Sequence, residues 1–165
     1  MRIDQGFLPI LGCNPKVLVL GSMPSVRSLE DRQYYAHPQN AFWWIMSELF
    51  GFDPLESYES RTSRLTGNSV AVWDVVQSCH RQGSLDSAIN QSSVQANDFL
   101  TLLNDYSTIR LIIFNGQAAQ KLFKKNVILN NYSGDFLVMP STSPANAATS
   151  RKSKLDSWQV LKSYI

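Results

Sequence analysis

Two asparagines, Asn40 and Asn115, stand where a carboxamide could take part in chemistry. Asn40 ends the segment YYAHPQN at residues 34–40, and Asn115 follows the apolar run of residues 109–114. An amide donates and accepts hydrogen bonds at once, so it can read a base edge or orient a water molecule. A carboxamide is scarcely basic, so Asn40 would supply proximity more than proton transfer. Asn40 can also cap the helix that follows, and the two roles are compatible.

A carboxylate and several aromatic residues accompany the two amides. Asp74 is the single carboxylate in the four segments that follow predicted strands, and it could read a base edge, support a cation or act as a structural cap. The aromatic residues at 34 and 35 offer flat faces for stacking a base. Phe42 and Trp43 are predicted to lie in the core. His37 is predicted to fix the local turn through a backbone hydrogen bond, ahead of a contact with a base or phosphate.

Two loops are rich in small and hydroxyl residues, GSMPS at 21–25 and PSTSPAN at 140–146. Such loops present backbone N–H groups and hydroxyls that suit phosphate oxygens, although a plain strand-to-loop turn is an equal alternative for residues 21–25. The sequence contains neither a Walker lysine motif nor a dinucleotide-binding fingerprint. The first loop also fails the G-x-S-x-G pattern of a nucleophile elbow.

The elements that must position these residues alternate between strands and helices. Short apolar runs predict strands, and helical spacing predicts helices. The predicted strands are 16–20, 69–73, 109–114 and 135–139, and the predicted helices are 41–50, 53–67, 94–106, 117–125 and 154–165. This alternation predicts an α/β fold with a parallel, doubly wound sheet. The segments after the strands should therefore meet at the carboxyl edge of the sheet and form a site there.

Composition limits the class of protein. A chain of 165 residues with 44% hydrophobic and 17% charged residues fits one globular domain. Cys13 and Cys79 are too few for a disulfide framework, a four-cysteine zinc site or an iron–sulfur cluster, so we expect no metal and no cofactor. The sequence has no apolar run long enough to span a bilayer and no signal peptide at its start, so a cytoplasmic protein is expected.

Charge alone does not decide whether the chain binds nucleic acid. The formal net charge is +2, and the basic residues gather at 151–154 and at 121–125. Either cluster could contact phosphates, and solvated helix faces are at least as good an interpretation.

Several ordered motifs together resemble the uracil-DNA glycosylase superfamily. They are GSMPS (21–25), HPQNAFW (37–43), WDVVQSC (73–79), GSLDSAI (83–89) and PSTSPANA (140–147). The pattern covers nearly the whole chain and is most similar to the hypoxanthine-DNA glycosylase branch. The resemblance implies a three-layer α/β/α fold with a central four-stranded parallel sheet, formed by one domain over residues 1–165. It also implies a monomeric, cytoplasmic DNA repair enzyme, nucleoid-associated when bound to DNA, that flips a deaminated base out of the duplex.

The resemblance assigns roles by position. Asn40 would carry catalysis, with Asn115 as the second candidate, and Tyr35 would stack on the flipped base. The other base-binding candidates are Asp74 and Met23, of which Met23 stands where uracil-specific members have a carboxylate or amide. Residues expected to contact phosphates or fill the duplex are Ser22, Ser25, Ser141, Ser143, Ala145 and Asn146. Uracil-specific members commonly have a histidine at the place of Ser141.

The strand-end segments contain no lysine, which predicts a monofunctional glycosylase without lyase activity. Two alternatives stay open. One is a glycosylase specific for uracil or thymine in G:U and G:T mismatches. The other is a DNA damage-binding module without catalysis, which would not need Asn40.

Overall fold

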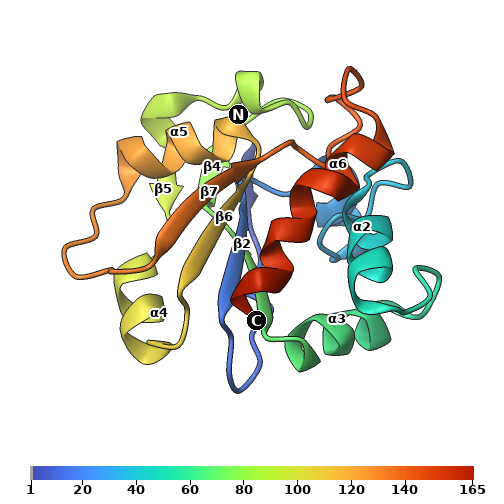
Figure 1. Ribbon diagram of the computed structural model, residues 1–165. Helices are drawn as coiled ribbons and strands as arrows, with labels where there is room; N and C mark the ends of the chain where they lie inside the picture. The colour runs from blue at the N-terminus through green and yellow to red at the C-terminus, as the bar shows by residue number, and fades with distance from the viewer. Residues whose placement is uncertain (1) are drawn as a thin grey trace.

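The computed structural model describes residues 2–165 and contains the expected parallel sheet. Its strands are β2 (Val17–Gly21), β3 (Val70–Asp74), β6 (Leu111–Asn115) and β7 (Asp135–Met139). They run in the order β3-β2-β6-β7 with every neighbouring pair parallel (Figure 1). The predicted fold class is therefore confirmed.

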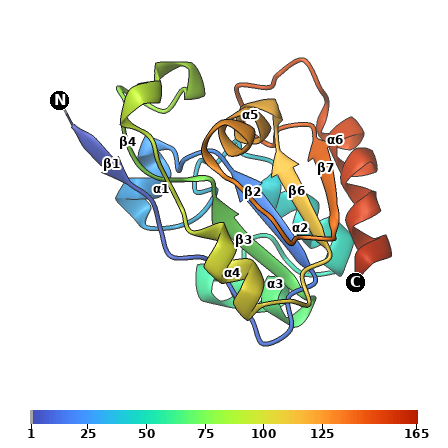
Figure 2. The same cartoon turned by 90° about the vertical axis from the view of Figure 1, so that its left-hand side faces the viewer.

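The central strands β2 and β6 are apolar up to their last residue because helices cover both faces of the sheet. Val17 and Val19 of β2 pack into one core with α2 (Phe42–Phe50), α3 (Tyr58–Gly67) and α6 (Arg151–Trp158). Leu18 and Leu20 point to the other face and pack with α4 (Phe99–Asp105) and α5 (Gln117–Asn126). Figures 1 and 2 show these two helix layers on either side of the sheet.

Helix α2 follows its sequence prediction closely, and its two ends have clear causes. The helix ends at Gly51, which adopts the left-handed backbone conformation (φ 71°) that a residue with a Cβ atom disfavours. At its start the side-chain oxygen of Asn40 accepts a hydrogen bond from the backbone N–H of Phe42, at 2.9 Å. The predicted N-cap is therefore wrong by one residue: Ala41 directly precedes the helix, and Asn40 reaches the Phe42 N–H from the position before it.

Three helix predictions are wrong in extent. The helix predicted over 53–67 begins only at Tyr58, because the side chain of Ser57 caps it through the N–H of Ser60. The helix predicted over 94–106 begins only at Phe99, because the side chain of Asp98 caps it through the N–H of Thr101, and Gln95–Ala96 is instead a short strand, β5. The helix predicted over 154–165 begins earlier, at Arg151, and continues after Trp158 as a 3-10 helix over Gln159–Tyr164. A short helix, α1 (Val26–Asp31), was not predicted.

A second, antiparallel sheet was not predicted. It contains β1 (Ile3–Gln5), β4 (Val76–His80) and β5, in the order β1-β4-β5. The segment after β3 therefore contributes only its first residues to the edge of the main sheet, and from Val76 onward it pairs in this second sheet.

In residues 2–165 no helix has the length and apolar character that crossing a membrane requires.

Candidate functional site

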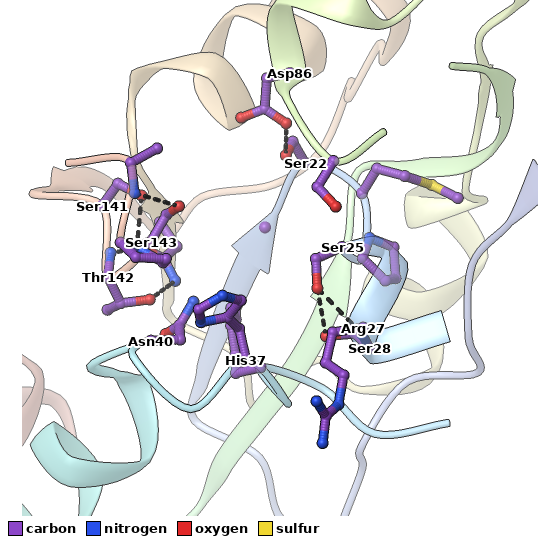
Figure 3. A pocket seen from close by; sticks show the side chains of 18 of the residues that line it. Ser22, Ser25, Arg27, Ser28, His37, Asn40, Asp86, Ser141, Thr142 and Ser143 are labelled. Carbon is purple, nitrogen blue, oxygen red and sulfur yellow. Dashed lines mark hydrogen bonds between the residues drawn. The ribbon is translucent and has the colours of Figure 1, made fainter. Parts of the chain in front are cut away.

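A cavity of about 340 Å³ lies at the carboxyl ends of the four parallel strands, as the alternating pattern predicts (Figure 3). Ten of the eleven candidate residues line it, namely Ser22, Met23, Ser25, Tyr35, Asn40, Asp74, Asn115, Ser141, Ser143 and Ala145. Asn146, the eleventh candidate, does not line the cavity, and its side-chain amide donates to the carbonyl oxygen of Ser141 at 3.1 Å.

Asn40 enters the cavity with its amide in a fixed orientation. Its Oδ1 atom must face the N–H of Phe42, because only an acceptor can occupy that position. The Nδ2 group, a donor, is therefore the end of the amide left for the cavity. A water molecule could accept this hydrogen bond through one lone pair and keep its second lone pair for a reaction.

Asn115 connects three parts of the site. Its Nδ2 group donates to Thr142 Oγ1 and its Oδ1 atom accepts from the Thr142 backbone N–H, both at 2.9 Å. The carbonyl oxygen of the buried Thr142 accepts in turn from the backbone N–H of Ala41, at 3.0 Å. The end of β6, the late loop and the segment that holds Asn40 are thus joined by hydrogen bonds.

Tyr35 is held in place at the cavity wall. It has a left-handed backbone conformation (φ 56°), and its ring stacks on Phe42 with centroids 4.1 Å apart. One ring face is therefore covered, and only the opposite face is left for a base. Its hydroxyl oxygen is buried and has no hydrogen-bond partner among the residues that the structure describes. Phe42 and Trp43 lie in the core, as predicted.

Asp74 is a buried carboxylate at the end of β3, with its Oδ2 atom unpartnered. The pKa of this carboxyl is raised to about 7, first by burial and then by the Asp86 carboxylate, while the Arg81 guanidinium opposes the rise. Gly21 of the neighbouring strand leaves space for the Asp74 carboxylate. A Cβ atom at position 21 would lie 2.5 Å from Asp74 Oδ1 and 3.3 Å from the Tyr35 hydroxyl. The site thus holds an acid that changes its charge near neutral pH.

The four candidate serines differ in the hydrogen bonds that their hydroxyls already form. The hydroxyl of Ser22 donates to Asp86, and that of Ser25 caps α1 through the N–H of Ser28. Ser141 and Ser143 accept from backbone N–H groups two residues later, at 3.2 Å each. Because these two hydroxyls act as acceptors there, their protons are free to donate to a phosphate.

Two further candidates complete the walls. Met23 is buried and gives the cavity an apolar side. His37 accepts a hydrogen bond from the Gln39 backbone N–H through Nδ1, at 3.1 Å, which agrees with the predicted structural role.

Within residues 2–165 no three His, Cys, Asp or Glu side chains group as metal ligands would. Cys79 is buried and Cys13 exposed.

Among the lining residues to which sequence reasoning assigned no role are Thr142 and Asp86. Thr142 lies in the late loop, and the sequence alone indicates no role for its hydroxyl. In the folded chain this hydroxyl accepts a hydrogen bond from Asn115. Asp86 belongs to the GSLDSAI motif but lies outside the four strand-end segments, and it reaches the cavity from a 3-10 helix (Asp86–Ala88).

Comparison with known proteins gives consistent results. Residues 9–162 match the family described as the uracil DNA glycosylase superfamily. A hypoxanthine DNA glycosylase of Methanosarcina acetivorans is 34% identical over 160 residues, covering 96% of this chain and 98% of the relative. A protein of the same name from Methanosarcina barkeri is 33% identical over 156 residues, covering 93% and 94%. The solution NMR structure of a Methanosarcina acetivorans protein described as a uracil DNA glycosylase superposes with a TM-score of 0.81 at 32% identity and covers 99% of both chains.

Proposed function

Because the chain belongs to the uracil-DNA glycosylase superfamily, we propose that it hydrolyses the N-glycosidic bond of a deaminated base in DNA, with the hypoxanthine of deoxyinosine as its preferred substrate. Two relatives that match nearly the full length carry the name hypoxanthine DNA glycosylase. The observation that carries the proposal is the cavity, in which the free amide donor of Asn40 accompanies a stacking ring and an unpartnered carboxyl.

A base inside the duplex cannot reach this cavity, so the nucleotide must be flipped out of the stack. Flipping costs a few kcal/mol and costs least for mismatched bases, which favours deaminated targets. The free face of Tyr35 would receive the base, while the hydroxyl protons of Ser141 and Ser143 would bind flanking phosphates. The neighbouring Ala145 and Asn146 would approach the space left in the duplex.

The reaction adds one water molecule across the C1′–N bond. The bond breaks with its electron pair going to the departing base, which leaves positive charge on the deoxyribose. The water oxygen then bonds to C1′, and the proton that it loses is balanced by the proton that the base gains. Asn40 would hold this water beneath C1′ through its Nδ2 donor, so its contribution is one of position.

Asp74 would bind a hypoxanthine base as a hydrogen-bond donor. The neutral carboxyl is a donor, and a carboxyl pKa of about 7 makes this form abundant at neutral pH. Hypoxanthine presents acceptors at O6 and N7, as guanine does. The apolar wall at Met23 would suit the flat base, since it offers no competing hydrogen bond.

This base contact predicts a pH dependence. If neutral Asp74 donates to the base, the rate of base release is highest below about pH 7 and falls as the pH rises through the Asp74 pKa. Asp74→Asn, whose amide donates at every pH, should abolish this alkaline decline. Single-turnover rates measured at several pH values test this, with the exposed Asp105→Asn as the charge-matched control. A wild-type rate that is constant across neutral pH would refute the role of Asp74.

We further propose that the protein works on DNA as a monomer, in the cytoplasm and on the nucleoid when bound to DNA. One chain supplies every wall of the cavity, so no second copy is needed to complete it.

The proposed function is tested on labelled duplexes that carry one deoxyinosine, uracil or xanthine. We expect release of hypoxanthine and strand breakage only after alkali or heat, because no lysine lines the cavity to act as an amine nucleophile. Breakage without alkali would contradict the monofunctional proposal. Cleavage at uracil alone would favour the mismatch-specific alternative, and binding without any cleavage would favour a damage-binding module.

A further inference from the structure

Asp86 brings a carboxylate into the cavity from outside the main sheet. It begins the 3-10 helix between β4 and β5, and its Oδ1 atom accepts a hydrogen bond from the Ser22 hydroxyl, at 2.5 Å. Figure 3 shows Asp86 extending toward Ser22 on one side of the cavity, with Asn40 and His37 on the other side. A carboxylate therefore lies across the cavity from the amide that would hold the water.

Asp86 forms no ion pair with any other residue in the range 2–165. The buried Arg81 is the neighbouring cation, but its guanidinium binds Asp4 at 3.1 Å and the carbonyl oxygen of Pro24. Burial raises the pKa of Asp86 above its ordinary value, and the Ser22 hydrogen bond and the Arg81 charge oppose this rise by stabilising the anion.

A negative charge at this place is unfavourable for binding DNA, whose phosphates repel it. It is favourable for breaking the N-glycosidic bond, because positive charge develops on the deoxyribose when the base departs. We infer that Asp86 is a second catalytic residue of this chain, whose carboxylate, held by Ser22, stabilises the cationic sugar while Asn40 holds the water. This inference rests on the proposed glycosylase function and deepens it.

The step needs no additional reactant. The carboxylate forms no bond to the sugar and takes no proton; it lowers the energy of the charge that appears at C1′ when the electron pair leaves with the base. Water then neutralises that charge as described for the proposed function. Asp74, whose carboxyl is partly neutral near pH 7, is less suited to this role.

The test compares Asp86→Asn and Asp86→Glu with the wild-type protein. Asparagine keeps an acceptor for the Ser22 hydroxyl and removes the charge, while glutamate keeps the charge. For each protein we would measure the single-turnover rate on a deoxyinosine duplex, the Kd for the undamaged duplex of the same sequence, and the Tm. Asp105→Asn, an exposed carboxylate at the end of α4, gives the same change in net charge away from the cavity.

We expect Asp86→Asn to lower the rate about 100-fold, the order found when one preorganised electrostatic group is removed, with a Kd that is unchanged or tighter. Asp86→Glu should recover most of the rate, and Asp105→Asn should retain it. A rate that survives Asp86→Asn, or an Asp86→Glu variant as inactive as Asp86→Asn, would overturn the inference. A wild-type protein inactive on every damaged duplex would instead refute the proposed function itself.

Discussion

Replacing Asn40 by alanine is expected to lower the single-turnover rate of base release about 1,000-fold. The substitution removes the Nδ2 donor that faces the cavity, and with it the group that would place the attacking water. Binding of undamaged DNA should change little, because Asn40 would contact the water and not the phosphates. The measurement is a single-turnover time course on a deoxyinosine duplex, with alkaline cleavage of the abasic product.

Asn40→Ala also removes the hydrogen bond to the Phe42 N–H, which costs about 1 kcal/mol of folding stability. Asn40→Ser separates the two effects, because serine caps a helix but is too short to place the same water. We expect Asn40→Ser to have a wild-type Tm and a rate as low as that of Asn40→Ala. Asn104→Ala, at an exposed position on α4, serves as the matched control. A wild-type rate in Asn40→Ala would contradict the mechanism.

Asn115→Ala is expected to reduce both the rate and the stability. Alanine leaves the backbone N–H and hydroxyl of the buried Thr142 without their partners, a loss of about 2–3 kcal/mol in the free energy of unfolding. The rate should fall about 100-fold, because Thr142 also holds the Ala41 N–H and thereby the segment of Asn40. Denaturant unfolding and the single-turnover assay measure the two effects.

A Thr142→Val variant shows whether Asn115 acts through Thr142 or directly on the departing base. Valine has nearly the same shape, keeps the backbone N–H bond to Asn115 Oδ1 and removes the Oγ1 acceptor. If Asn115 is a positioning residue, Thr142→Val should reproduce part of the rate loss. An unchanged rate in Thr142→Val, beside a slow Asn115→Ala, would indicate that Asn115 contacts the base.

The sequence predicted the parts of the fold that depend on local hydrophobic pattern. The strand over residues 135–139 has the predicted bounds, because an apolar run here ends at a proline that cannot continue the ladder. The order of strands and helices was enough to place the ends of all four strands at one cavity. Eight of the ten candidate residues that line the cavity belong to segments that follow strands, whereas Tyr35 and Asn40 come from residues 34–40 and were assigned by the resemblance.

The parts that escaped prediction depend on partners far along the chain. Gln95 and Ala96 form a strand because residues of β4 pair with them, and no local pattern shows that pairing. The role of the buried Thr142 hydroxyl depends on the fold, which places it where it accepts a hydrogen bond from Asn115. Asp86 is brought to Ser22 across 64 residues by the second sheet, which is itself a tertiary feature.

The hydrogen bond between the Ala41 N–H and the Thr142 carbonyl has a consequence for biosynthesis. The ribosome makes the Asn40 segment early, but the loop that fixes it only about a hundred residues later. A nascent chain can therefore form the first strands and α2 while its cavity still lacks a wall. The cavity is complete only after the late loop has been made and the Thr142 carbonyl has met the Ala41 N–H.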